Sequence, residues 1–225
     1  STPLYSSAAS DVYKRQGGGQ FKTLKVFTEA LNARYGEAKT LEDYAQKSQL
    51  MSYEAERAMF EAYARNKFNS TGVIQWMLNN AWPSMIWHLY DYYLRPGGGY
   101  FGTKKACEPV HAQFSYDDRS VVIINSTLQA RKRLRVGAKI LALDMKELFA
   151  KETEVDLEAN ASVKTFSLPE LSDITPVYFV QLELKDETGR RISSNLYWLS
   201  TKKDVLNWDK STWYYPATSD YADYT

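Results

Sequence analysis

The second half of the chain contains short segments in which apolar and polar residues alternate, and polar turns separate these segments. In the clearest segment, residues 177–185, every second residue from Tyr178 to Leu184 is strongly apolar, and residues 186–189 follow as a polar turn. A period of two residues is that of a strand with one buried face. Short strands at close spacing are typical of an antiparallel β-sandwich, which this pattern predicts from about residue 110 onward.

Helical periodicity replaces this alternation in the first half. Residues 21–35 place Leu24, Phe27 and Leu31 at helical spacing. Residues 40–66 contain no proline or glycine and start with a threonine that can cap a helix, so a second, long helix is predicted there. The residues that share one face of this helix are Leu41, Tyr44, Ser48, Met51, Ala55, Met59, Ala62 and Tyr63.

A short apolar run follows the long helix. Residues 72–78 are apolar on both faces, which fits a strand buried in a parallel sheet, and a helix followed by such a strand is a unit of an α/β fold. We expect a helix over residues 83–94, a loop over residues 95–102 and a short helix over residues 103–111. The chain is therefore predicted to have an α/β half and an all-β half that meet between residues 109 and 113.

Aromatic and amide side chains cluster after the predicted strand. In an α/β barrel, chemistry is delivered at the carboxyl ends of the strands. Trp76 can lay its indole face against the apolar C–H surface of a sugar ring, and Trp82 can form a second wall. Asn79 and Asn80 offer donors and acceptors to hydroxyl groups, and Asp91 can bond a sugar or hold its own loop together. The alternative is a core tryptophan followed by turn-forming asparagines.

Composition excludes several other classes of function. The formal net charge of +1 gives no global field that would attract nucleic acid or an anionic membrane, and no apolar run approaches the roughly 20 residues of a membrane span. One cysteine and two histidines leave little room for a zinc site, so we expect no metal ion and no cofactor. Aromatic residues reach 14%, and among them Tyr90, Tyr92 and Tyr93 are expected to pack.

Three stretches resemble a known family. Residues 53–63 (YEAERAMFEAY) and 72–125, which include WMLNNAWPS, closely resemble exo-β-D-glucosaminidases of glycoside hydrolase family two. Residues 195–215 (NLYWLSTKKDVLNWDKSTWYY) resemble the immunoglobulin-like domain that follows the catalytic barrel in those enzymes. Related β-mannosidases share a looser tryptophan–asparagine–tryptophan–proline pattern and are the second interpretation.

The resemblance implies a fold class of α/β plus all-β. Residues 17–109 would be the C-terminal part of a (β/α)8 TIM barrel, with residues 72–78 as its eighth strand. Residues 110–225 would form an immunoglobulin-like β-sandwich that is truncated. Residues 1–16 contain the sequence DVYKRQ, whose codons resemble a sequencing adaptor, and we interpret them as an artefact or a disordered tail. The chain would be a fragment that packs against N-terminal domains of its parent protein.

The resemblance also implies a reaction. Retaining glycosidases use two carboxyl groups about 5–5.5 Å apart, one as the acid and one as the nucleophile. In this family they lie on the fourth and seventh barrel strands, upstream of this segment, so we assign no catalytic residue here. Glu54, Glu56 and Glu61 are expected on the solvated outside of the barrel.

The parent protein would remove β-linked glucosamine from chitosan-type oligosaccharides, so the expected partner is an amino-sugar oligosaccharide. Its polymeric substrate suggests a periplasmic or secreted enzyme. The alternatives are a β-mannosidase and a non-catalytic module that binds carbohydrate or acts as a scaffold.

Overall fold

The computed structural model describes residues 24–81, 83, 88–212 and 216–225. The predicted artefact or tail at residues 1–16 lies outside this part of the chain. The chain divides into two compact units, described separately here. The helical unit contains the described residues up to Asn32, residues 36–60 and residues 73–105, and the sandwich unit contains residues 33–35, 61–72 and 106–225.

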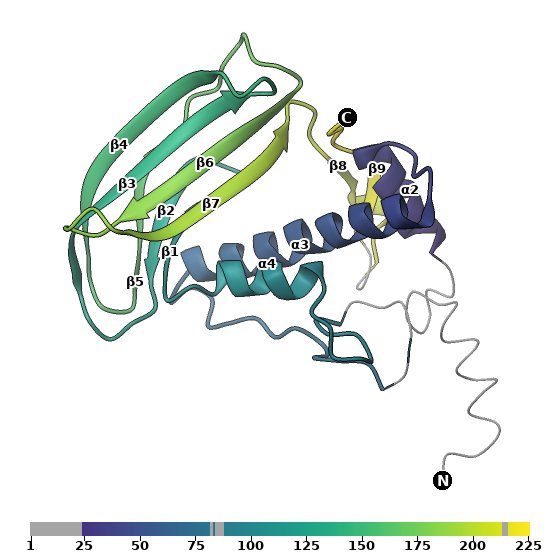
Figure 1. Ribbon diagram of the computed structural model, residues 1–225, viewed down its shortest axis with the longest axis horizontal. Helices are drawn as coiled ribbons and strands as arrows, with labels where there is room; N and C mark the ends of the chain where they lie inside the picture. The colour runs from purple at the N-terminus through teal and green to yellow at the C-terminus, as the bar shows by residue number, and fades with distance from the viewer. Residues whose placement is uncertain (1–23, 82, 84–87, 213–215) are drawn as a thin grey trace. The chain divides into compact units, whose positions relative to one another are not determined.

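The sandwich unit is built from two antiparallel sheets (Figure 1). The first has the order β1-β2-β5 and consists of β1 (Val110–Phe114), β2 (Ser120–Asn125) and β5 (Ala161–Ser167). The second has the order β4-β3-β6-β7 and consists of β3 (Arg131–Ala142), β4 (Glu147–Leu157), β6 (Val177–Lys185) and β7 (Arg191–Ser200). A separate pair consists of β8 (Val205–Asn207) and β9 (Ala217–Asp220), and a short 3-10 helix, η2 (Trp208–Lys210), follows β8. The antiparallel sandwich predicted from the alternating pattern is confirmed.

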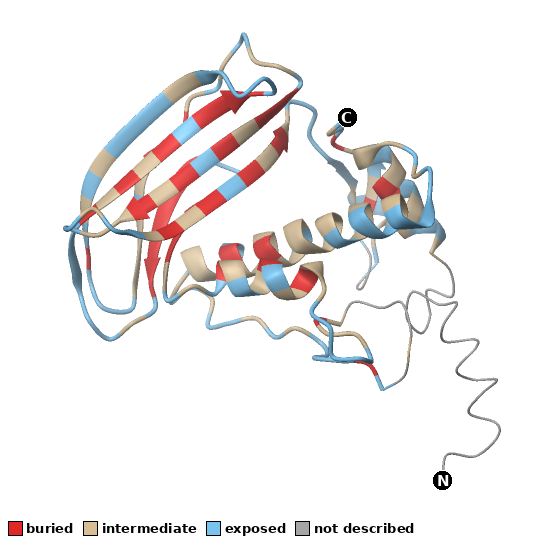
Figure 2. Cartoon of the chain, in the orientation of Figure 1, coloured by how far each residue is buried: buried red, intermediate tan, exposed pale blue. Residues whose placement is uncertain are grey.

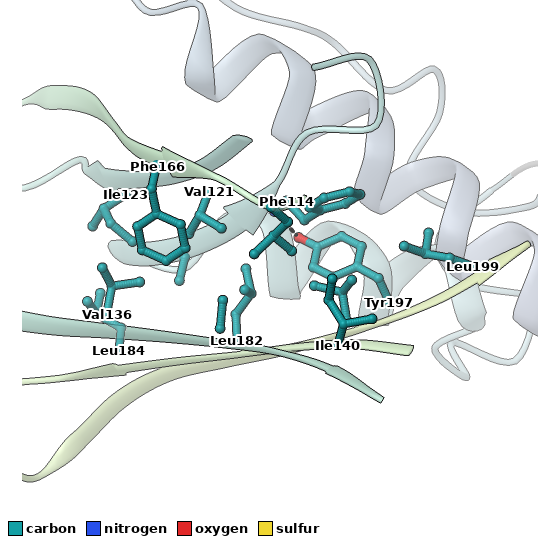
Figure 3. Close-up of a cluster of buried hydrophobic side chains, with 14 of the residues drawn as sticks. Phe114, Val121, Ile123, Val136, Ile140, Phe166, Leu182, Leu184, Tyr197 and Leu199 are labelled. Atoms are coloured by element: carbon teal, nitrogen blue, oxygen red, sulfur yellow. Dashed lines mark hydrogen bonds between the residues drawn. The ribbon is translucent and has the colours of Figure 1, made fainter. Parts of the chain in front are cut away.

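Alternation along the strands produces the core of the sandwich. Buried residues recur at every second position along much of β3, β6 and β7, as Figure 2 shows. Ile140 pairs with Val180, and both side chains are fully buried. Ile123 and Phe166 from the other sheet join the same cluster (Figure 3). Each such buried aliphatic or aromatic side chain contributes about 1.5–3 kcal/mol to the stability of the fold.

The helical unit contains α2 (Lys25–Tyr35) up to Asn32, most of α3 (Leu41–Arg65), and α4 (Gly98–Ala106) up to Lys105. At the start of α3, the Thr40 hydroxyl accepts the Asp43 N–H at 3.1 Å, and the Asp43 carboxylate accepts the Lys39 N–H at 3.0 Å. This reciprocal capping satisfies two backbone donors at the helix end. The long helix predicted over residues 40–66 is confirmed, and α2 confirms the described part of the first helix.

The loop predicted over residues 95–102 is wrong, because α4 begins at Gly98. A Cβ atom at Gly98 would meet the backbone oxygen of Gln49 at 1.9 Å, and one at Gly102 would meet that of Tyr53 at 2.2 Å. The two glycines therefore let α4 lie directly against the backbone of α3. In the sequence the two glycines suggest a loop, but in the structure they permit a close contact between two helices.

The strand predicted over residues 72–78 is also wrong. The structure assigns no strand to residues 72–78, and the described residues contain no strand that pairs with them. A strand requires backbone partners on a neighbouring strand, and the sheets in the described part of the chain supply no parallel one. In the predicted helix over residues 83–94, the described residues 88–94 form turns and bridges, including Tyr90 with Asn79 and Pro96.

The buried face of α3 differs from the predicted one. Leu41 and Tyr63 on the predicted apolar face are exposed, whereas Arg57 and Glu61 are buried. The expectation that Glu61 lies on a solvated surface is therefore wrong. Its carboxylate is bound by polar side chains of the sandwich unit, which replace the water that it would otherwise need.

Candidate functional site

The segment from Gly72 to Asn80 holds most of the predicted site residues, and it exposes its large side chains. Trp76 is 70% exposed and Ile74 is 89% exposed, and Leu78 is also exposed. An apolar side chain buried in a core would show almost no exposure. The alternative interpretation of Trp76 as a core tryptophan therefore does not describe this chain, and its indole face is free to meet a flat apolar ligand surface.

The two asparagines have different environments. Asn79 is exposed, and its amide nitrogen donates to the backbone oxygen of Asn80 at 3.2 Å. Asn80 is buried, and its side-chain oxygen is hydrogen-bonded to Nδ1 of His88. Burial lowers the pKa of His88, so its imidazole is neutral at pH 7 and the Nδ1–H donates to this oxygen. His88 thus fixes the amide orientation of Asn80, and the amide nitrogen is the group left to bond a ligand.

Asp91 holds its own loop together. Its Oδ1 accepts the Arg95 N–H at 2.8 Å, and its own N–H donates to the Arg95 oxygen at 3.1 Å. The loop is tied to the preceding segment because the Tyr90 N–H donates to the Leu78 oxygen at 3.0 Å. The structural alternative for Asp91 is therefore observed, and a second role toward a ligand stays a prediction. Trp82 lies outside the described residues.

Two tyrosines of this loop were expected to pack but are exposed. Tyr92 and Tyr93 lie edge to face with ring centroids 5.2 Å apart, and both present surface to solvent. Tyr90, by contrast, lies 4.9 Å from the ring of Tyr100 and is partly buried. The hydrogen bond to Tyr100 raises the pKa of Tyr90, so the Tyr90 hydroxyl is neutral over the physiological range. The loop thus adds two exposed aromatic rings to the indole of Trp76.

The described residues offer few other kinds of site. They contain no group of three or more histidine, cysteine or acidic residues placed to hold a metal ion. None of the helices in the described part of the chain is long and apolar enough to cross a membrane. Cys107 lies at the surface, and desolvation of its thiol by the surrounding protein raises the pKa of that thiol, so it is not an activated nucleophile.

The chain is 40% identical to an exo-β-D-glucosaminidase from Amycolatopsis orientalis over 98% of its length, and 41% identical to one from Streptomyces avermitilis over the same share. The predicted resemblance to exo-β-D-glucosaminidases is confirmed. This chain spans only 22% and 25% of those two relatives. An alignment that covers 98% of the chain does not favour the interpretation of residues 1–16 as an artefact, which stays a prediction.

Solved structures give the same result. A complex of the exo-chitosanase CsxA from Amycolatopsis orientalis with PNP-β-D-glucosamine matches 94% of this chain with a TM-score of 0.90 and 42% identity, and the match covers 26% of the CsxA chain. Residues 117–204 match the family described as Mannosidase Ig/CBM-like domain. The sandwich is therefore of the immunoglobulin-like type predicted from the sequence.

β-Mannosidases are more distant relatives. A mannosylglycoprotein endo-β-mannosidase from Lilium longiflorum is 29% identical over 73% of this chain, which covers 18% of that protein. A β-D-mannosidase structure from Dictyoglomus thermophilum has a TM-score of 0.69 over 88% of this chain and 26% of its own, at 20% identity, which shows a shared fold.

Proposed function

We propose that the parent protein of this chain is a retaining glycoside hydrolase that removes β-linked glucosamine from chitosan-type oligosaccharides, and that this chain supplies part of its substrate pocket. The observation that carries the proposal is the match over 94% of this chain to an exo-chitosanase solved in complex with PNP-β-D-glucosamine. The endo-β-mannosidase from Lilium longiflorum is less similar, at 29% identity over 73% of this chain.

Trp76 is the residue through which this chain contacts the sugar. Its exposed indole face can cover the apolar C–H surface of a pyranose ring. Asn79 and the amide nitrogen of Asn80 can then bond hydroxyl groups at the ring edge. Trp82 and Asp91 are placed with them in the proposed pocket on the strength of the sequence alone. A few oriented polar groups around an aromatic wall are the usual make-up of a sugar site.

Residues 17–109 are proposed to complete a (β/α)8 barrel in the parent protein, and residues 110–225 to form the following sandwich. The exposed side chains of Ile74 and Leu78 support this, because an extended apolar segment is stable in water only when neighbouring strands cover it. The catalytic pair of carboxyl groups then belongs to barrel strands outside this chain, and the parent's N-terminal domains cover the exposed segment.

The decisive experiment uses the protein encoded by the complete gene. It should hydrolyse PNP-β-D-glucosaminide, and Trp76→Ala should lower kcat/KM about 10- to 150-fold, since roughly 1.5–3 kcal/mol of apolar burial on the sugar is lost. Trp208→Ala is the matched control: Trp208 is 73% exposed, close to Trp76, but lies on η2 of the sandwich unit. Equal losses in the two variants would refute the assignment of Trp76.

Other outcomes distinguish the alternatives. Faster hydrolysis of PNP-β-D-mannoside than of the glucosaminide would identify a β-mannosidase. A complete gene without two barrel carboxylates would leave a non-catalytic module that binds carbohydrate. The 225-residue chain alone should show no turnover of either substrate, and turnover above background would contradict the placement of the catalytic pair outside it.

A further inference from the structure

A buried ionisable cluster lies within the sandwich unit, and the proposed function does not use it. His111 on β1 is fully buried, and Glu61 in the last two turns of α3 is 2% exposed. Nε2 of His111 lies 2.8 Å from Oε1 of Glu61, and Nδ1 lies 3.0 Å from Oε2 of Glu108. One imidazole therefore bridges two carboxyl groups that are 47 positions apart in the sequence.

Neutral donors complete the cluster. The amide nitrogen of Asn195 lies 2.8 Å from Oε1 of Glu61, and the Tyr197 hydroxyl lies 2.9 and 3.0 Å from the two oxygens of the same carboxylate. The Ser193 hydroxyl donates to Glu108 at 2.6 Å. The carboxylate oxygens of Glu61 thus lie within hydrogen-bond distance of three donor groups, from His111, Asn195 and Tyr197.

The hydrogen bonds also set the charge of His111. An ionised carboxylate only accepts, so both ring nitrogens must carry a proton to bond Glu61 and Glu108 together. Burial alone would lower the pKa of His111, but the hydrogen bonds and charges of Glu108 and Glu61 outweigh burial and raise it. The contacts of both ring nitrogens and the raised pKa therefore favour the imidazolium form of His111.

Three elements place polar groups on the imidazole or on its carboxylate partner. Helix α3 contributes Glu61, and Arg57, one turn earlier on that helix, is fully buried. The residues before β1 contribute Glu108, and β7 contributes Asn195 and Tyr197. Loss of the proton from His111 would leave two carboxylates without the cation that joins them. A buried charge that loses its partner is strongly destabilising.

The cluster anchors a segment of the chain. Residues 61–72 belong to the sandwich unit although α3 begins in the helical unit. Other contacts also hold this segment: Arg65 makes two bonds of 2.7 Å to Asp117, and Lys67 donates to Asn125, Ser126 and Asn160. The Asp117 side chain is exposed, and exposed pairs contribute little. The contact at Glu61 is fully buried and involves a histidine, so it is the one expected to respond to pH.

We propose that Glu61, His111 and Glu108 form a pH-sensitive lock that fastens residues 61–72 to the immunoglobulin-like sandwich and weakens when His111 loses its proton. This is independent of the proposed function, since it concerns only contacts within the sandwich unit. The contacts of the lock are strongest while His111 is protonated, and a rise in pH weakens them.

The direction of the pH effect follows from linkage. A histidine whose pKa is higher in the folded than in the unfolded chain binds more proton when folded, between about 6.5 and its folded value. Stability from the lock is fully present below about pH 6.5 and is lost as the pH rises through the folded pKa of His111. In that window the unfolding equilibrium constant should rise up to about tenfold per pH unit, the limit for one proton.

The first test is a nitrogen NMR titration of the 225-residue chain with labelled histidine. The chain has only two histidines, so His88→Gln assigns both sets of ring signals. His111 should show two protonated ring nitrogens at pH 7.5, whereas His88, whose pKa burial lowers, should be neutral and acts as the internal control. A neutral His111 at pH 6.5 would overturn the proposal, and this measurement needs no variant of His111.

The second test measures unfolding in urea between pH 6 and 9.5, with hydrogen exchange of residues 61–66. The wild-type chain should lose stability as the pH rises, and the protection of these amides should fall with it. His111→Gln keeps a side-chain donor but cannot titrate, and it should remove the slope. The same slope in His111→Gln, or protection of residues 61–66 that does not change with pH, would show that the cluster is not the lock.

Discussion

Replacing Gly102 by alanine tests the contact between α3 and α4. The added Cβ would lie 2.2 Å from the Tyr53 oxygen and 3.0 Å from its carbonyl carbon, and ordinary contacts start at 3.4 Å. The two backbones must therefore separate by roughly 1 Å, and such overpacking costs about 1–3 kcal/mol. Alanine in a helix returns about 0.8–1 kcal/mol relative to glycine. Because backbone rather than a flexible side chain must move, we take the upper end of the overpacking cost, and subtracting the gain in helix propensity leaves an expected net loss of about 2 kcal/mol.

Gly99→Ala is the matched control in the same helix. Its Cβ would meet only side-chain atoms, Glu56 Cγ at 3.2 Å and Leu89 Cδ2 at 3.6 Å, and these can shift. The variant gains the same helix propensity, so its free energy of unfolding should equal that of the wild type or exceed it by up to about 1 kcal/mol. The stability of both variants is measured by unfolding in urea, monitored by far-ultraviolet circular dichroism, which reports the helices. If Gly102→Ala proves as stable as Gly99→Ala, the close backbone contact does not exist in solution.

Two other substitutions test single groups. Tyr197→Phe removes a hydroxyl that bonds Glu61 and also accepts a buried backbone N–H, and it should lower the free energy of unfolding in urea by about 2–4 kcal/mol. In the control Tyr178→Phe, the lost hydroxyl accepts from a part-buried arginine, and the cost should be about 1 kcal/mol or less. Similar losses in the two variants would contradict the geometry of the cluster. Glu56→Gln should stabilise the chain modestly at pH 7, because burial raises the pKa of Glu56 and its charged form is disfavoured in the fold. This gain in stability should vanish near about pH 4, where both side chains are neutral. A gain that persists at that pH would rule out charge as the cause.

Local patterns were sufficient to predict the sandwich and the long helix. In the β6–β7 hairpin, the alternation of residues 177–185 fixes which side chains face the core, and the turn that follows has Gly189 at φ 85°, a conformation that glycine adopts readily. The capping residues of α3 are likewise adjacent in the sequence. Each of these signals is carried by neighbouring residues, so a single sequence is enough to interpret it.

Predictions failed where the deciding partner was distant or absent. Gly98 and Gly102 look like loop residues unless one knows that α3 passes within contact distance of them. Residues 72–78 have the composition of a buried strand, but no strand among the described residues pairs with them. In the candidate site, Trp76 is exposed, and its role toward a sugar stays a prediction; no pattern in the sequence indicated that His88 would bind the oxygen of Asn80.

Glu61 shows most clearly why composition misleads about buried charge. A glutamate on an amphipathic helix is solvated in most proteins, because burying its charge costs more than helix packing returns. The cost is offset here by donors from His111, Asn195 and Tyr197, which lie 50 to 136 positions further along the chain. One signal was nevertheless in the sequence: a histidine at the start of an apolar strand, three residues after a glutamate, must leave water as the strand folds. The fold adds a second carboxylate, Glu61 from the end of α3, on the other ring nitrogen of the same imidazole.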